Sequence, residues 1–444
     1  MRGALLGLAA VTAVCAGCTS GSSPAPHNNP APASVSPMTG ISSGCAGGGS
    51  EVEEATASPD HVYAAWIGCG GIGFAASADS GRHFGSPSTV PGSAGHSWDP
   101  AITTAPDGTV YVSYMHADGP VGAKSTVMYP SVAVSADNGA SFTAHPVRPP
   151  APGNWGDRDF IAAGPGGQLY LTWDYGPSAA EVKLLCSKSG SCAYSAGDFN
   201  IVLQTSADGG KTWSPIRQVE PGFPLGGGYS GPLVLDRQGR LDVLYAGHPT
   251  SKSTLAVSPG YEYFTSSAGG THWPGSPRRL APDSGSLSLR EWWIDGDISA
   301  DAAGNLYATW DTQTGTADIG WLSYSANGGG AWSAPIRVTP DTGTAPHITE
   351  SAGGPAGVAY VAWQTSAPAA GYTTYLRPFS ITKGWLSPAI TVSTARGNPA
   401  IWPGDTFGIT KLPGNGTRIS LTWGSAVPPS KLSEIYASVV TLST

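Results

Sequence analysis

The chain of 444 residues is poor in charge, because only 12% of its residues are Asp, Glu, Lys or Arg. Its 22 Lys and Arg residues against 30 Asp and Glu residues give a formal net charge of −8, and no basic run occurs, so the sequence argues against a nucleic-acid partner. Gly, Pro, Ser and Thr are abundant, Trp and Tyr are plentiful, and helical periodicity is absent from the body of the chain, which together predict an all-β protein.

Residues 1–17 form the first predicted segment, in which Arg2 precedes an apolar run as long as a secretory signal peptide. The run is too short to span a bilayer as a permanent helix. The letters CAGC at 15–18 resemble a bacterial lipoprotein box, in which Cys18 receives the lipid, although Cys15 stands where that box usually has leucine. We therefore predict an exported lipoprotein that touches the membrane only through its anchor at Cys18, with simple secretion as the alternative.

Residues 18–42 are rich in Ser, Pro and Ala and are predicted to be a flexible linker before a single domain over 43–444. Four cysteines remain after the signal region, and an even number in an exported protein predicts disulfides. Proximity in sequence favours Cys45 with Cys69 and Cys186 with Cys192, although four cysteines allow three connectivities.

A short strand that alternates apolar and polar residues and ends in an aromatic residue recurs seven times in the domain. The copies are HVYAAW (61–66), TVYVSY (109–114), QLYLTW (168–173), RLDVLY (240–245), NLYATW (305–310), VAYVAW (358–363) and RISLTW (418–423). Each lies in a unit of roughly 60 residues that divides into about four strands, which predicts a seven-bladed β-propeller, with six blades as the alternative. The last copy stops at its third strand, so we predict that a strand near 37–43 closes the ring.

A second repeat interleaves with the first. Its copies are SADSGRHF (77–84), SADNGASF (135–142), SADGGKTW (206–213), SSAGGTHW (266–273) and SANGGGAW (325–332). The aspartate is replaced by Ala268 in the fourth copy and by Asn327 in the fifth. A catalytic carboxylate is needed only once, whereas a stabilising turn is needed in every blade, so we interpret these strings as structural turns.

These strings resemble the Asp-box repeats of the sialidase-like (BNR-repeat) β-propeller superfamily, and the resemblance covers the chain after the linker. It implies a propeller fold, and the superfamily includes sialidases, other glycan-cleaving enzymes and propellers without catalysis. Two features depart from true sialidases. No arginine lies between Arg2 and Arg82, where the Arg-Ile-Pro motif is expected, and Tyr229, which matches the nucleophilic tyrosine, falls in the middle of the chain.

The residues at the start of each inner strand are predicted to converge at one end of the propeller axis, which we call the mouth. Carboxylates there suit acid–base cleavage of a glycosidic bond, indoles stack on sugar faces, and arginines bind a substrate carboxylate. Capping of turns and packing between blades explain any one of these residues equally well. We predict catalytic roles for Asp157, Asp159, Asp295, Asp297, Asp405 and Tyr229, and substrate-binding roles for Trp98, Asp99, Trp155, Arg158, Arg290, Trp292, Trp293, His347 and Trp402.

The sequence therefore predicts a glycan-active protein, a glycoside hydrolase of sialidase-like fold whose partner is a glycan or polysaccharide and which is a monomer. The alternative is a surface propeller that binds a glycan or a protein without turnover. No cofactor is predicted, although oxygen ligands at the mouth suit an axial calcium ion as another reading. A pair of carboxyls about 5–10 Å apart with one raised pKa favours hydrolysis, whereas aspartates bonded only to backbone amides favour binding.

Overall fold

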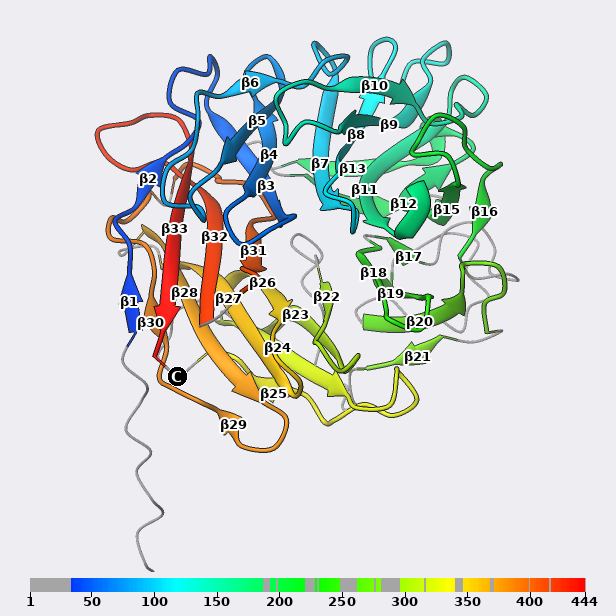
Figure 1. The fold of residues 1–444 in the computed structure, drawn as a ribbon. Helices are drawn as coiled ribbons and strands as arrows, with labels where there is room; N and C mark the ends of the chain where they lie inside the picture. Colours follow the sequence, from blue (N-terminus) through cyan, green and yellow to red (C-terminus); the bar gives the residue numbers. More distant parts are fainter. Residues whose placement is uncertain are drawn as a thin grey trace, which may run out of the picture.

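The computed structural model describes residues 33–186, 192–196, 199–219, 228–229, 231–247, 262–274, 277–280, 296–314, 317–339, 346–367, 371–398, 400–414 and 417–443. Seven antiparallel sheets stand around a common axis as the blades of a β-propeller (Figure 1). The seven-bladed prediction is confirmed over the six-bladed alternative. The predicted signal segment, the lipid acceptor Cys18 and the first part of the linker lie outside the described residues. Within the described ranges, no helix is long and apolar enough to cross a membrane.

The first four blades follow one another along the chain. Blade 1 contains β3 (Gly49–Thr56), β4 (Val62–Gly68), β5 (Gly71–Ser77) and β6 (Ser88–Thr89). Blade 2 contains β7 (Ser97–Thr104), β8 (Val110–Ala117), β9 (Met128–Ser135) and β10 (Thr143–Pro146). Blade 3 contains β11 (Trp155–Ala163), β12 (Leu169–Gly176), β15 (Asn200–Ser206) and β16 (Arg217–Gln218). Blade 4 contains β17 (Gly228–Tyr229), β18 (Leu233–Leu235), β19 (Arg240–Gly247), β20 (Glu262–Ala268) and β21 (Arg278–Arg279).

The remaining blades complete the ring. Blade 5 contains β22 (Asp297–Ala300), β23 (Leu306–Thr314), β24 (Ala317–Ser325) and β25 (Ile336–Arg337). Blade 6 contains β26 (Pro346–Gly353), β27 (Val358–Ala367), β28 (Gly371–Ser380), β29 (Gly384–Trp385) and β30 (Ile390–Thr391). Blade 7 contains β31 (Gly408–Lys411), β32 (Thr417–Ser425) and β33 (Glu434–Leu442), with β1 (Ala33–Val35) and β2 (Thr39–Gly40) from the other end of the chain. The short 3-10 helices η1 (Pro165–Gly167) and η2 (Ala179–Glu181) and the hairpin of β13 (Lys183–Cys186) and β14 (Cys192–Ala196) belong to the connections of blade 3.

The ring closes where the two ends of the described chain meet, with β1 beside β33 (Figure 1). The predicted closing strand is confirmed, but pairing begins earlier than expected, at Ala33 opposite Leu442, inside the segment assigned to the linker. Pro37 has no N–H to donate and separates β1 from β2, which is tolerated because both strands lie on the outer edge of the sheet. The side chain of Ser36 bridges the gap by accepting a hydrogen bond from the Val439 N–H at 2.9 Å.

The apolar core lies between neighbouring blades. The aromatic residues that end the repeated strands are packed there, and five of these tryptophans are at most 1% exposed: Trp66, Trp173, Trp310, Trp363 and Trp423. Inner strands of successive blades also contact one another, from β3 through β7, β11, β18, β22, β26 and β31 back to β3. The alternating pattern therefore buries one face of each sheet against the next blade and leaves the inner strands around the axis.

The strings of the second repeat are turns held by their own side chains, as predicted. In the third copy the Ser206 hydroxyl accepts a hydrogen bond from the Gly210 N–H at 2.9 Å and donates one to Asp208 at 2.8 Å. Asp208 in turn accepts the Thr212 N–H at 2.9 Å. Asn327 makes the same contacts in the fifth copy. In the fourth copy, which has Ala268, the Ser267 hydroxyl accepts the His272 N–H instead.

Replacing Ser206 by alanine is expected to lower the free energy of unfolding by about 1–2 kcal/mol, because the buried Gly210 N–H then lacks its acceptor. Urea denaturation measures the change. Lys211→Ala in the same turn is the matched control, since its exposed side chain is expected to matter by less than about 0.5 kcal/mol. Equal stabilities of the two variants would contradict a structural role for the serine.

One predicted disulfide is present. Cys45 and Cys69 are bonded across 24 positions of the chain and join the segment before β3 to the β4–β5 turn. Cys186 stands opposite Cys192 in the register of the β13–β14 hairpin, while their side chains lie outside the described part of the chain.

Candidate functional site

The candidate site lies at the mouth, where the inner strands of blades 1 to 3 begin (Figure 1). Each of β3, β7 and β11 carries a register shift there, between Ser50 and Val52, between Trp98 and Ala101, and between Asp157 and Phe160. The shifts hold Glu51, Asp99 and Arg158 at φ values of 51°, 45° and 44°. Residues other than glycine rarely adopt positive φ, and such strain clusters at functional sites. The three bulged strands thus place Glu51, Asp99 and Arg158, each with positive φ, at the same end of the axis.

Arg158 of blade 3 contacts both blade 2 and the segment that leads into blade 7. Its guanidinium donates a hydrogen bond to the Asp405 carboxylate at 2.6 Å, and its backbone N–H donates to the Asp99 carboxylate at 3.0 Å. The Arg158 and Asp405 side chains are only 15% and 12% exposed. Arg158, which the sequence predicts to bind a substrate carboxylate, is therefore paired with the carboxylate of Asp405 in the protein itself.

Glu51 and Asp99 share a hydrogen bond between their carboxyl groups, which requires a proton on one of them. Burial raises the pKa of Glu51 well above its usual value, and the charges of Asp405 and Asp99 raise it further. Burial also raises the pKa of Asp99, and the charge of Asp157 adds to this effect. Since the two groups interact strongly, they take up and release protons as a pair. The mouth therefore holds two interacting carboxyls with raised pKa values beside the Arg158–Asp405 ion pair.

Asp159 is the most deeply buried carboxyl of this group. It is 2% exposed. Burial raises the pKa of Asp159 well above its usual value. Together with Glu51, Asp99, Arg158 and Asp405, it lines a pocket of about 20 Å³, room for about one water molecule. We call this space the mouth pocket.

The aromatic residues predicted at the mouth have different environments. The Trp98 indole donates to the Asp157 carboxylate at 2.7 Å and thereby orients it. Trp155 is only 6% exposed and packs in the core between blades, so the packing interpretation holds for it. Trp402 is partly exposed in the loop before β31.

Asp297 lies apart from this group. With Glu53 and Glu350 it lines an axial cavity of about 140 Å³, which shares Glu53, Phe160 and Thr406 with the mouth pocket. Asp297 accepts hydrogen bonds from the Ser351 N–H at 2.8 Å and from the Ser351 hydroxyl at 3.2 Å. Burial raises its pKa to about 6.

The Asp297 carboxyl is expected to make the free energy of unfolding depend on pH. Its pKa of about 6 lies above the usual 3.8, so between these values the folded state binds more protons than the unfolded state. The stability from this proton is present at pH 4 and is lost as the pH rises through 6. Asp297→Asn stays neutral, so we expect it to be more stable than the parent at pH 7 by on the order of 1 kcal/mol, but not at pH 4. Urea denaturation at both pH values tests this, and parallel pH profiles of parent and variant would refute it.

Several predicted site residues are not placed. Asp295, Arg290, Trp292 and Trp293 lie outside the described residues. Tyr229 in β17 and His347 in β26 are described in their backbone alone, with Tyr229 opposite Ala246 and His347 within a register shift. Among the residues that the structure describes, no three His, Cys, Asp or Glu side chains are arranged to hold a metal ion.

The sequence interpretation missed Glu51 and Glu53. The string EVEE at 51–54 places three carboxylates at the beginning of the first inner strand, in blade 1. This acidic run lies at the same position of the repeat as Asp99 and Arg158, and it is the sequence signal that indicates Glu51 and Glu53 as site residues.

No protein-family model matches the chain, and no curated protein matches it. Membership of the sialidase-like superfamily therefore stays a prediction. A protein of unknown function from Dyadobacter fermentans is 13% identical, with 93% of this chain and 99% of that chain covered and a TM-score of 0.50. An ulvan lyase of polysaccharide lyase family PL25 is 11% identical, with 90% and 95% covered and a TM-score of 0.56. The NanB sialidase of Streptococcus pneumoniae is 12% identical, with 78% and 68% covered and a TM-score of 0.49. At these identities the similarity shows the propeller fold alone.

Proposed function

We propose that the protein is a carbohydrate-active enzyme, a glycoside hydrolase that cleaves its substrate at the mouth. The observation that carries this proposal is the Glu51–Asp99 pair, which shares a proton beside the Arg158–Asp405 ion pair. Glycoside hydrolysis requires one carboxyl that donates a proton to the leaving oxygen and a second, ionised carboxylate. The mouth offers both kinds within one group of side chains.

In this mechanism the Glu51–Asp99 pair is the general acid. Burial raises the pKa of both carboxyls, so the pair releases its proton at a higher pH than an ordinary carboxyl does. Asp157 is the second carboxyl group of the mechanism, since it is partly exposed and its orientation is set by the Trp98 indole. Arg158 acts indirectly: its positive charge lowers the pKa of Glu51 and of Asp99 and opposes the effect of burial.

A carbohydrate substrate is also supported by the similarity to the ulvan lyase, whose structure aligns with 90% of this chain. Ulvan lyase is a polysaccharide lyase, and a second structure of it holds the saccharide -[GlcA(1-4)Rha3S]-. Lyase chemistry at the mouth is therefore an outcome that the experiment must distinguish from hydrolysis.

The experiment is incubation of the protein with sialylated, uronate-containing and neutral glycans, followed by mass spectrometry of the products. Hydrolysis adds one water per bond cleaved, whereas a lyase adds none and leaves an unsaturated sugar. Products that carry the added water support the proposal, and unsaturated products replace it with a lyase.

A non-catalytic propeller that binds a glycan or protein is the second candidate. Asp99 and Asp297 each accept a hydrogen bond from a backbone N–H, of Arg158 and Ser351 respectively, as expected for carboxylates with a structural role. Glycan binding without any product would favour this candidate.

We further propose that the protein is exported and anchored through Cys18. The Cys45–Cys69 disulfide supports an oxidising compartment. Mass spectrometry of the mature N-terminus tests the proposal, because a lipid-modified Cys18 and an unmodified N-terminus differ in mass; an unmodified mature N-terminus would leave simple secretion.

A further inference from the structure

The end of the axis opposite the mouth carries another cavity, which is larger than the mouth pocket and the axial cavity. It measures about 440 Å³, within the range of about 300–1,000 Å³ typical of ligand sites. Its walls are the turns that follow the inner strands β18, β22 and β26 and the end of β31. Because Glu51, Asp99 and Arg158 lie where inner strands begin, this space, which we call the basal cavity, is separate from the mouth pocket.

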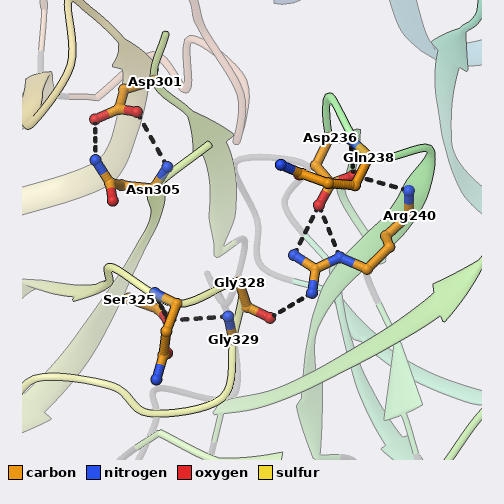
Figure 2. A network of polar contacts seen from close by, with 9 residues as sticks. Asp236, Gln238, Arg240, Asp301, Asn305, Ser325, Gly328 and Gly329 are labelled. Atoms are coloured by element: carbon orange, nitrogen blue, oxygen red, sulfur yellow. Dashed lines mark hydrogen bonds and ion pairs between the residues drawn. The ribbon is translucent and has the colours of Figure 1, made fainter. Parts of the chain in front are cut away.

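The two carboxylates in the wall of the basal cavity belong to Asp236 and Asp301, and both accept several hydrogen bonds from the protein itself. Asp236 accepts the N–H groups of Gln238 and Arg240 and pairs with the Arg240 guanidinium at 2.7 Å. Asp301 accepts hydrogen bonds from Ala303, Asn305, Tyr307 and Gly357. Figure 2 shows Asp236 turned onto Arg240, and Asp301 onto Asn305. Neither negative charge is directed to a ligand.

The two cationic side chains in the same wall, those of Arg237 and Lys411, lack such contacts with the described residues. Arg237 is exposed, Lys411 is partly exposed, and neither side chain forms an ion pair or a hydrogen bond with the described residues. The basal cavity therefore presents positive charge on a chain whose formal net charge is −8. The rest of its wall is largely apolar, with Val234, Leu235, Ala300, Ala302, Pro355 and Pro413.

We propose that the basal cavity binds a sugar-sized ring that carries a carboxylate or a sulfate group. Arg237 and Lys411 bind the anionic group, and the aliphatic wall packs against the C–H face of the ring. This inference does not rest on the proposed function, because no residue of the mouth takes part. An anionic saccharide and a free inorganic anion offer the same charge, so the experiment includes both.

The experiment is calorimetric titration of the protein, at low ionic strength, with a sulfated disaccharide, its unsulfated parent and inorganic sulfate. We expect the sulfated disaccharide to bind at least about tenfold more tightly than either of the others, and binding to weaken with added salt. In Arg237→Gln/Lys411→Gln, affinity is expected to fall by at least about tenfold.

Lys211→Gln/Lys383→Gln is the matched control. It removes the same charge from two exposed positions outside the basal cavity, and the parent affinity is expected to be kept. The proposal is overturned by absence of binding, by equal affinity for the unsulfated disaccharide or for inorganic sulfate, or by equal loss of affinity in the control. Loss of affinity in Glu51→Gln alone would place the ligand at the mouth and would also overturn it.

Discussion

Replacing Glu51 by glutamine is expected to lower the rate of glycan cleavage by about 10²–10⁴-fold while the protein stays folded. Glutamine has nearly the same shape and keeps a donor toward Asp99, but it cannot release a proton to the leaving oxygen. Asp99→Asn is expected to cause a loss of similar size, since the two carboxyls share one proton and act as a unit. The measurement is kcat/KM of each variant on the glycan that the panel identifies.

Asp208→Asn is the matched control for this loss. It makes the same carboxylate-to-amide change in an Asp-box turn of blade 3, away from the mouth pocket, and it is expected to keep the parent kcat/KM. Glu51→Gln activity within a factor of about three of the parent would remove the Glu51–Asp99 pair from the mechanism. In the parent, the rate is expected to decrease at alkaline pH, because the pair loses the proton that its raised pKa retains.

Replacing Arg158 by methionine is expected to lower the free energy of unfolding at pH 7 by about 3–5 kcal/mol. The guanidinium is mostly buried against Asp405, and its charge also lowers the pKa values of Glu51 and Asp99. Among the described residues of the mouth pocket, Arg158 is the one that carries a positive charge. Its removal therefore leaves buried carboxylates without a counter-charge. Urea denaturation at several pH values measures the effect.

The deficit of Arg158→Met is expected to shrink as the pH is lowered. The folded-state pKa values of Glu51 and Asp99 lie above the unfolded ones and rise further without Arg158, so the folded variant binds more protons and stability falls as the pH rises. The double variant Arg158→Met/Asp405→Asn is expected to recover part of the loss at pH 7, because it removes one of the unpaired charges. A deficit that is independent of pH and not reduced in the double variant would indicate lost packing instead.

The fold could be predicted from the sequence because its signals are local and repeated. Most turns of the second repeat are held by hydrogen bonds between positions two and four apart, as between Ser206 and Gly210, so the interacting atoms lie within the eight-residue string. The strand that ends at Trp173 likewise carries its alternation within a few residues. Ring closure was predictable because one blade lacked a strand, but its start at Ala33 depends on how the chain passes Pro37 at the sheet edge.

The site was predictable only in part. The repeat register alone predicts that Asp99, Arg158 and Asp405 lie at one end of the axis. It could not assign Arg158 to Asp405 rather than to a substrate, because these residues are 247 positions apart and meet only when the ring closes. The bulges that hold Glu51 and Asp99 at positive φ, and the burial that leaves a proton between them, likewise arise from neighbouring blades.

The sequence by itself thus predicted a propeller of repeated four-strand units and the end of the axis at which the carboxyl groups gather, since hydrophobic alternation and turn chemistry act over short stretches of chain. Only the tertiary structure decided that the ring has seven blades, which carboxyls have raised pKa values and which one pairs with Arg158. Those properties depend on burial and on charges supplied by distant segments, and they exist only once the seven blades surround a common axis.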